Sequence, residues 1–179
     1  MVWQLGLLPE PVRPWYRTRS VAVIAWLWWQ RLPKPANWLG LSPVTARVGV
    51  SAALVFAIVV GWNLLRVRVV GSAGQLADLP PAEFGWILGA ATVEELDFRG
   101  VIQTRLAQLW RPALANGVTA VAFLAIHFPG WLLLAAMPDA TTIASVFLID
   151  LVCGWLRRRT GSLWPAIAAH TANNFGALL

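Results

Sequence analysis

The stretch EELDFRG at 94–100 contains four ionisable residues within six consecutive positions. It lies in an otherwise apolar part of the sequence. The ten residues before it, at 84–93, carry no charge. Glu95 and Arg99 are four positions apart with the acid first, which is the favourable order for an ion pair on a helix. Glu94 lies about 100° around the helix from Glu95. This ion pair therefore leaves the Glu94 carboxylate available for other chemistry.

Two histidines and an asparagine supply further groups for proton transfer and hydrogen bonding. His127 follows Phe123 by four positions, and His170 and Asn174 are also four apart, so that each pair projects from one face of a helix. A carboxylate can act as general base on a water molecule, with a histidine relaying the proton. Histidine and asparagine donors can stabilise the oxyanion of a tetrahedral intermediate, typically by roughly 3–4 kcal/mol per donor. These residue types predict hydrolysis at a polar centre built from three helices.

The elements that must position these side chains are membrane helices. The chain is 58% hydrophobic and only 12% charged, whereas a soluble domain carries about 25% charged residues. About 20 apolar residues cross the hydrocarbon core as a helix, and the stretches 48–65, 112–138 and 160–179 contain no Asp, Glu, Lys or Arg. We expect an all-α, polytopic transmembrane bundle with an intramembrane polar cavity and no separate soluble domain.

Five spanning helices are expected, with a loop at 66–83 that is rich in glycine and proline. The second span starts near Pro81, with a possible kink at Gly100, and Pro129 is expected to break or bend the third. The five spans are 48–65, 81–110, a helix opened by Pro112, 140–156 and 162–179. The sequence thus divides into an N-terminal arm at 1–47 and a transmembrane domain at 48–179, with the polar residues at about 80–179.

The segment 20–30 is apolar, but only eleven residues separate Arg19 from Arg31. As a helix it is about 16 Å long, roughly half the hydrocarbon thickness. Its tryptophans favour the membrane interface. We predict an interfacial helix in the plane of the membrane; the alternative is a short span with snorkelling arginines.

The net charge of +6 and the pI near 11.3 do not indicate nucleic-acid binding, because the basic residues lie at the ends of apolar segments. Alternating the five spans places eleven of the 14 Lys and Arg residues on one side of the membrane and Arg66 and Arg68 on the other, with Arg99 inside it. By the positive-inside rule, the side with eleven is cytoplasmic. We expect an integral protein of the plasma (inner) membrane with a cytoplasmic N-terminus.

Each polar group also has a simpler interpretation as a structural residue. The charges at 94–99 could be a solvated helix end, His127 a packing residue, and the segment at 170–174 a fraying terminus. Asp97 is expected to be solvated or paired, and Asp150 to pair with Arg157 or a neighbouring polar group. The joint occurrence of the charges at 94–99, His127 and the segment 170–174 on three predicted spans favours function, because ionisable groups at bilayer depth are costly unless they pair or face water.

Three short motifs resemble those of the CPBP intramembrane proteases, the CAAX-prenyl-protease and bacteriocin-processing group also called Abi. EELDFRG resembles the family's E-E-x-x-x-R motif, FLAIH at 123–127 its F-x-x-x-H motif, and HTANN at 170–174 its H-x-x-x-N motif. The motifs occur in the family's order over roughly 80–179. The resemblance implies that Glu94 and His127 activate water and that His170 and Asn174 form the oxyanion pocket. Glu95 and Arg99 would order the site.

The resemblance implies an intramembrane endopeptidase that cleaves a membrane-associated protein or peptide, and we expect it to act without a cofactor. One alternative is a zinc enzyme, because Glu94, His127 and His170 match a His₂Glu ligand set, although H-E-x-x-H is absent. A second is an immunity or scaffold protein that binds a peptide without cutting it. A third is a small transporter in which Glu94, His127 and Asp150 form a proton path; the lack of an internal repeat disfavours it.

Overall fold

The computed structural model describes residues 30, 34–71, 74, 76, 78–133, 135 and 137–179. This part of the chain is helical and contains no strand. The predicted all-α class is therefore confirmed. The interfacial helix predicted at 20–30 lies outside the described residues except for Gln30.

The helices follow one another with short connections. A first short helix and a long one are followed by a nearly continuous helical stretch of three segments, a broken helix and two further helices. They are α2 (Pro35–Leu39), α3 (Ala46–Val70), α4 (Pro81–Glu95), the π-helix η2 (Leu96–Gln103), α5 (Thr104–Leu109), α6 (Pro112–Ala125), α7 (Phe128–Leu133), α8 (Ala140–Thr160) and α9 (Trp164–Gly176).

Helix α3 is longer than the sequence pattern predicts. It continues to Val70 and ends at Gly71, whose φ of 103° favours glycine. The loop predicted to begin at residue 66 is therefore wrong over its first five residues. The reason is that Arg66 does not end the helix: its Nη2 donates to the carbonyl of Gly176 at 2.9 Å, so that its charge is accommodated while the helix continues.

The predicted break near Pro129 is confirmed and falls just before the proline. Helix α6 begins at Pro112, as predicted, and ends at Ala125. A turn at Ile126 and His127 separates it from α7, in which Pro129 is the second residue. A proline is tolerated in the first turn of a helix because the N–H it lacks has no intrahelical partner there. The break places His127 at a bend between two helices.

Helix α8 has clear caps at both ends. At its start the Asp139 carboxylate accepts a hydrogen bond from the backbone N–H of Thr142 at 2.7 Å. This bond stabilises the ionised form and lowers the pKa of Asp139. At its end Gly161 adopts a left-handed conformation with a φ of 68°. The three preceding arginines lie in the last turn, where the helix dipole favours cations.

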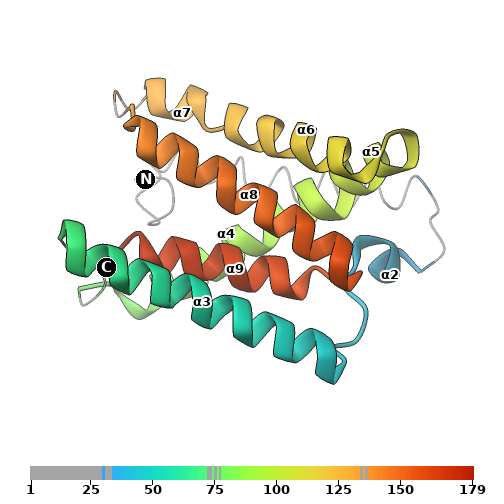
Figure 1. Ribbon diagram of the computed structural model, residues 1–179, viewed down its shortest axis with the longest axis horizontal. Coiled ribbons are helices and arrows are strands. Elements are labelled where there is room, and N and C mark those ends of the chain that lie inside the picture. Colours follow the sequence, from blue (N-terminus) through green and yellow to red (C-terminus); the bar gives the residue numbers. More distant parts are fainter. Residues whose placement is uncertain are drawn as a thin grey trace.

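Helix α9 lies at the centre of the bundle. It packs against α3, α4 and α8, while α6 packs against α8 and η2. Figure 1 shows α3 beside α9 along one edge, α6 and α7 along the other, and α8 between them. Large apolar side chains on the outer helices face outward, for example Ile58 and Trp62 on α3. An outer apolar surface around a core that contains charged residues is typical of a membrane protein.

Three helical segments of the described chain are long and apolar enough to cross a bilayer: Ala46–Val69, Pro112–Leu133 and Ala140–Thr160. The stretch from Pro81 to Leu109 is long enough but carries the charged cluster. Helix α9 has 13 residues, which corresponds to about 20 Å of helix. The chain is an integral membrane protein, and the count of five spans stays a prediction.

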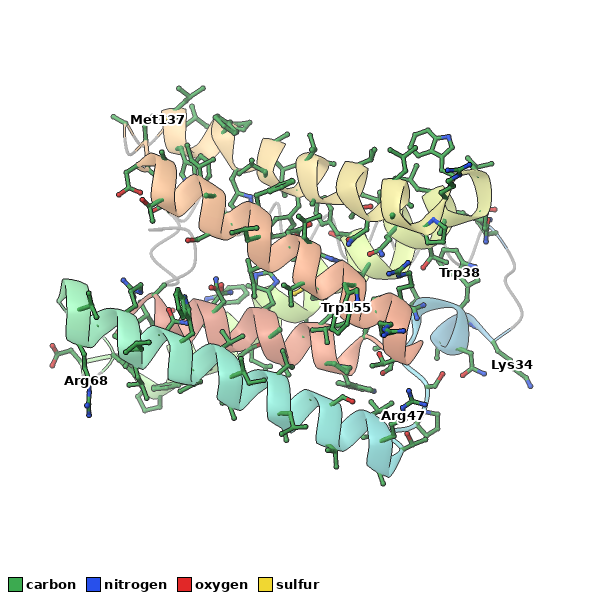
Figure 2. All side chains as sticks on the ribbon, in the orientation of Figure 1. Lys34, Trp38, Arg47, Arg68, Met137 and Trp155 are labelled. Carbon is green, nitrogen blue, oxygen red and sulfur yellow. The ribbon has the colours of Figure 1, made fainter. Side chains whose placement is uncertain are left out.

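Basic residues gather at the end of the bundle where α3 begins. Figure 2 shows Lys34, Trp38 and Arg47 at this end and Arg68 at the opposite one. Arg105 stacks over the Trp38 ring at 5.1 Å, and Arg157 donates to the Trp38 carbonyl at 3.2 Å. Two separate helices, α5 and α8, thus each bring an arginine to the same end of the bundle.

Helices α3 and α9 approach closely at Gly176, and this contact yields a first prediction. A Cβ added at Gly176 would collide with the side chain of Asn63, which is held by a 2.8 Å bond to the Val59 carbonyl. We expect Gly176→Ala to destabilise the protein by about 1–3 kcal/mol, the usual cost of overpacking. Thermal unfolding in detergent measures this effect.

The paired control is Asn63→Ala, which removes the atoms that the new methyl group would strike. Asn63→Ala should lower the stability of the Gly176→Ala variant less than it lowers that of the wild type. The double variant should recover part of the Tm that Gly176→Ala loses. Strictly additive effects of the two substitutions would contradict this close contact.

Candidate active site

The charged cluster of EELDFRG lies where the helix changes its hydrogen-bonding pattern. Helix α4 ends at Glu95 and continues directly as the π-helix η2. Single π-helical turns inside α-helices occur frequently at functional sites. Gly100, at which a kink was suggested, lies within this π-helical segment. Asp97, Phe98 and Arg99 are all buried, so Asp97 is not solvated.

The predicted ion pair between Glu95 and Arg99 is present. Arg99 Nη1 lies 3.1 Å from Glu95 Oε1, and both side chains are at most 1% exposed. The guanidinium also stacks over the Phe123 ring, with Cζ 5.3 Å from the ring centroid. A buried charge is costly unless it is paired and hydrogen-bonded. The pair therefore places a buried positive group beside Glu95, the second of the two consecutive glutamates.

His170 reaches this pair from helix α9. Its Nδ1 lies 2.8 Å from Glu95 Oε1, and its Nε2 lies 3.5 Å from Glu94 Oε2. Because the Glu95 carboxylate, paired with Arg99, accepts hydrogen bonds, the His170 Nδ1–H is the donor of the short bond. The two ring nitrogens therefore face the two carboxylates, and His170 is oriented by Glu95 while its other nitrogen points at Glu94.

His127 approaches the same centre from the bend after α6. Its Nδ1 lies 2.7 Å from the carbonyl oxygen of Phe123. Since a carbonyl can only accept, Nδ1 carries the hydrogen, and in the neutral ring Nε2 holds the lone pair. Glu94 and His170 both interact electrostatically with His127. The half-buried His127 is thus held in the tautomer that a general base needs.

Phe123 packs between the two histidines and the arginine. Its ring centroid lies 4.7 Å from that of His127, 5.6 Å from that of His170 and 5.0 Å from that of Phe98. The contact with Phe98 is edge-to-face, the geometry that aromatic pairs favour. Phe123 therefore sets the spacing between side chains of α6, η2 and α9.

Asn174 lies on α9 one turn after His170, and both are buried, at 2% and 4% exposure. The segment at 170–174 is therefore an ordered helical turn at the centre of the bundle rather than a fraying end. All six residues selected from the sequence lie on α4, η2, α9 or the bend after α6. Four of them, Glu94, Glu95, Arg99 and His170, form one connected cluster.

Asp150 on α8 also belongs to this cluster. Its carboxylate forms an ion pair with Arg99 Nη2, which in addition donates to the Asp150 backbone carbonyl at 2.7 Å. Of the two expected partners, Arg157 is wrong, because Arg157 binds the Trp38 carbonyl instead; the alternative, a neighbouring polar group, is confirmed and is Arg99. The available signal was a single acid within the stretch 140–156, which carries no other charge. Sequence spacing could not show that its partner lies 51 positions away.

The donor set offers no convergent metal site in the described part of the chain. There, no three His, Cys, Asp or Glu side chains come together in a way that could hold a metal ion. Of the three proposed zinc ligands, His170 turns one nitrogen to Glu95 and the other to Glu94. His127 uses one nitrogen for a backbone carbonyl.

Apolar helices of membrane length thus surround a buried cluster of Glu, Arg and His side chains. Residues 79–176 match the family described as type II CAAX prenyl endopeptidase, Rce1-like. The match covers more than half of the chain, and the chain belongs to this family. The resemblance noted from the three motifs is thereby confirmed, and all six selected residues fall within the matched range. No curated protein and no solved structure matches the chain.

Proposed function

We propose that the protein is an intramembrane endopeptidase in which Glu94 and His127 activate a water molecule. Membership of a CAAX prenyl endopeptidase family supports a hydrolase that acts on peptide bonds of a protein or peptide at the membrane. The observation that carries the proposal is the placement of His170 between Glu95 and Glu94, with distances of 2.8 and 3.5 Å. Residues far apart in the sequence thereby meet at one buried point.

In the proposed reaction, Glu94 removes a proton from water while His127 Nε2 accepts or relays it. The hydroxide oxygen bonds to the carbonyl carbon of the scissile peptide, and the carbonyl oxygen becomes an oxyanion. Donation from Asn174 and from the imidazolium form of His170 stabilises that oxyanion. The proton held by Glu94 or His127 then passes to the departing amine as the C–N bond breaks.

Glu95 and Arg99 have a different role in this proposal. Glu95 accepts the His170 Nδ1–H and fixes the ring orientation, as the carboxylate does in a Ser-His-Asp triad. Arg99 holds Glu95 in place through their 3.1 Å contact. Neither residue needs to touch the substrate, and we assign both to the ordering of the site.

The family supports a prenylated protein or peptide as the substrate, and a cleavage assay tests this proposal. We expect purified protein in nanodiscs to cleave a quenched peptide that carries an isoprenylated C-terminal CAAX sequence, and to cleave the same peptide without the lipid more slowly. Mass spectrometry of the fragments locates the broken bond. Cleavage of both peptides at equal rates would contradict selection of a prenylated substrate.

The same peptide-cleavage assay tests whether activity requires a metal ion. We expect the rate to stay within about twofold of its initial value after treatment with a chelator, because the ring nitrogens of His170 face carboxylates. A loss of activity that added zinc restores would instead establish the zinc enzyme. The control for chelator damage is the unfolding temperature, which should be unchanged.

The non-enzymatic alternative makes the opposite prediction in cells. Membrane peptide profiles of cells that carry wild-type protein or Glu94→Gln should differ by at least one fragment if the protein is a protease. Identical profiles, together with no cleavage of the peptide with or without its lipid, would favour an immunity or scaffold protein.

We propose a cytoplasmic N-terminus, since the basic residues at the start of α3 and the end of α8 lie on one side of the bundle.

A further inference from the structure

Helix α8 is joined to the site by polar side chains that bind its backbone. Arg99 Nη2 donates to the carbonyl of Asp150 at 2.7 Å, Gln103 Nε2 to that of Gly154 at 3.0 Å, and Asn116 Nδ2 to that of Leu151 at 3.0 Å. Arg99 and Gln103 come from η2, and Asn116 comes from α6. Three bonds from two helices therefore fix the position of α8 over a single turn.

Gly154 permits this close approach. A Cβ at this position would collide with the Asn116 carboxamide and lie 2.8 Å from Gln103 Oε1. Gly154 and Asp150 are four positions apart and lie on the same face of α8. The glycine thus allows α8 to come near enough for the Asp150 carboxylate to reach Arg99.

A chain of contacts connects Asp150 to His170. Its carboxylate pairs with Arg99, Arg99 pairs with Glu95 at 3.1 Å, and Glu95 accepts from His170 at 2.8 Å. Asp150 and Arg99 are at most 2% exposed, so water does not screen these contacts. Each link restricts the next, because a planar guanidinium that binds two acids has a defined orientation.

We propose that Asp150 is a positioning residue that acts through Arg99 and Glu95 to orient the His170 ring. The expected effect of Asp150 on turnover rests on the proposed function, whereas its expected effect on the orientation of the His170 ring does not. A contribution to stability does not by itself explain an acid at position 150, since replacing a buried ion pair by apolar residues is often neutral or stabilising. A second acid on Arg99 does, however, fix the direction in which the guanidinium faces Glu95.

The presence of only two histidines makes this inference measurable. Protein labelled with ¹³C and ¹⁵N at histidine gives two sets of imidazole NMR signals, which a His127→Gln sample assigns. We expect Asp150→Asn to shift or broaden the His170 ring signals and to change those of His127 less. Should Asp150→Asn fail to fold, Asp150→Glu keeps the charge but displaces the carboxylate and should move the same His170 signals.

Asn116→Ala is the matched control. It removes one of the three bonds to α8 without touching Asp150, Arg99 or Glu95, so it tests whether any loosening of α8 has the same effect. We expect it to lower the Tm but to leave the His170 signals in place. Unchanged His170 signals in both Asp150 variants, or equal shifts in Asn116→Ala, would overturn the inference.

The kinetic readout separates this inference from the proposed function. With the prenylated peptide, Asp150→Asn should lower kcat by about 100-fold with KM little changed, the size of effect expected when a catalytic group is misplaced by about 1 Å. Asn116→Ala should keep kcat within about threefold. If wild-type protein cleaves no peptide yet His170 responds to Asp150→Asn, the proposed function fails and the positioning role stands. A normal kcat in Asp150→Asn would contradict the positioning role in catalysis.

Discussion

Glu94→Gln is expected to lower kcat by about 10²–10⁴-fold, the usual contribution of general acid–base catalysis, with little change in KM. Glutamine has nearly the same shape as glutamate and keeps an oxygen that can face His170 Nε2 across the present 3.5 Å. It cannot accept a proton from water. The folded structure should therefore persist while the chemical step fails, and the Tm should stay within a few degrees of wild type. Initial rates with the prenylated peptide and thermal unfolding in the same detergent measure both effects.

Glu83→Gln provides the matched control for this substitution. Glu83 lies in the first turn of the same helix, three turns before Glu94, and is half-buried. The same change of charge in the same element should leave kcat within about twofold. Equal losses in the two variants would indicate a general effect of charge on α4. Full activity in Glu94→Gln would remove Glu94 from the proposed mechanism.

Hydropathy and proline positions were sufficient to predict most of the helices. The spans expected at 48–65 and 140–156 lie within α3 and α8, and Pro81 and Pro112 each begin a helix. These features are local, because the bilayer demands a run of apolar residues and a proline restricts the backbone around it. The end of α3 was predicted less well, since whether Arg66 ends the helix depends on a carbonyl of α9.

The chemistry of the site was predictable where residues four apart share a helix face. This rule predicted the Glu95–Arg99 pair, and it placed His170 and Asn174 on one face of the last helix. It could not predict that His170 contacts both glutamates. The π-helical turn was also not predictable, because no periodic signal distinguishes η2 from an ordinary helix. The contributions of Asp150 and Gly154 depend on how α8 packs against η2, which no local pattern records.

Arg99→Met is expected to destabilise the protein more than any other substitution considered. Methionine has a flexible apolar chain that can occupy much of the same space. It would leave the buried carboxylates of Glu95 and Asp150 without their cation. Removing one partner of a buried ion pair costs about 3–5 kcal/mol, because an uncompensated charge remains. Thermal unfolding in nanodiscs should show a large loss of Tm, and turnover should be lost with it.

Arg99→Lys should rescue only part of this loss. A lysine restores the charge but not the planar fork, so one ammonium cannot reproduce the contacts with Glu95 Oε1, the Asp150 carboxylate and the Asp150 carbonyl together. Arg158→Met is the control, because Arg158 is an exposed arginine of α8 and its loss should change stability by about 1 kcal/mol or less.

The triple variant Glu95→Gln, Arg99→Met, Asp150→Asn separates stability from function. Removing both acids with the arginine leaves no uncompensated charge, so the Tm should recover toward that of wild type. Activity should not recover, because the glutamine at 95 no longer presents a carboxylate to His170 Nδ1. Wild-type stability of Arg99→Met alone would show that neither acid depends on Arg99. Recovery of activity in the triple variant would show that the buried ion pairs serve only the packing of the helices and not the orientation of His170.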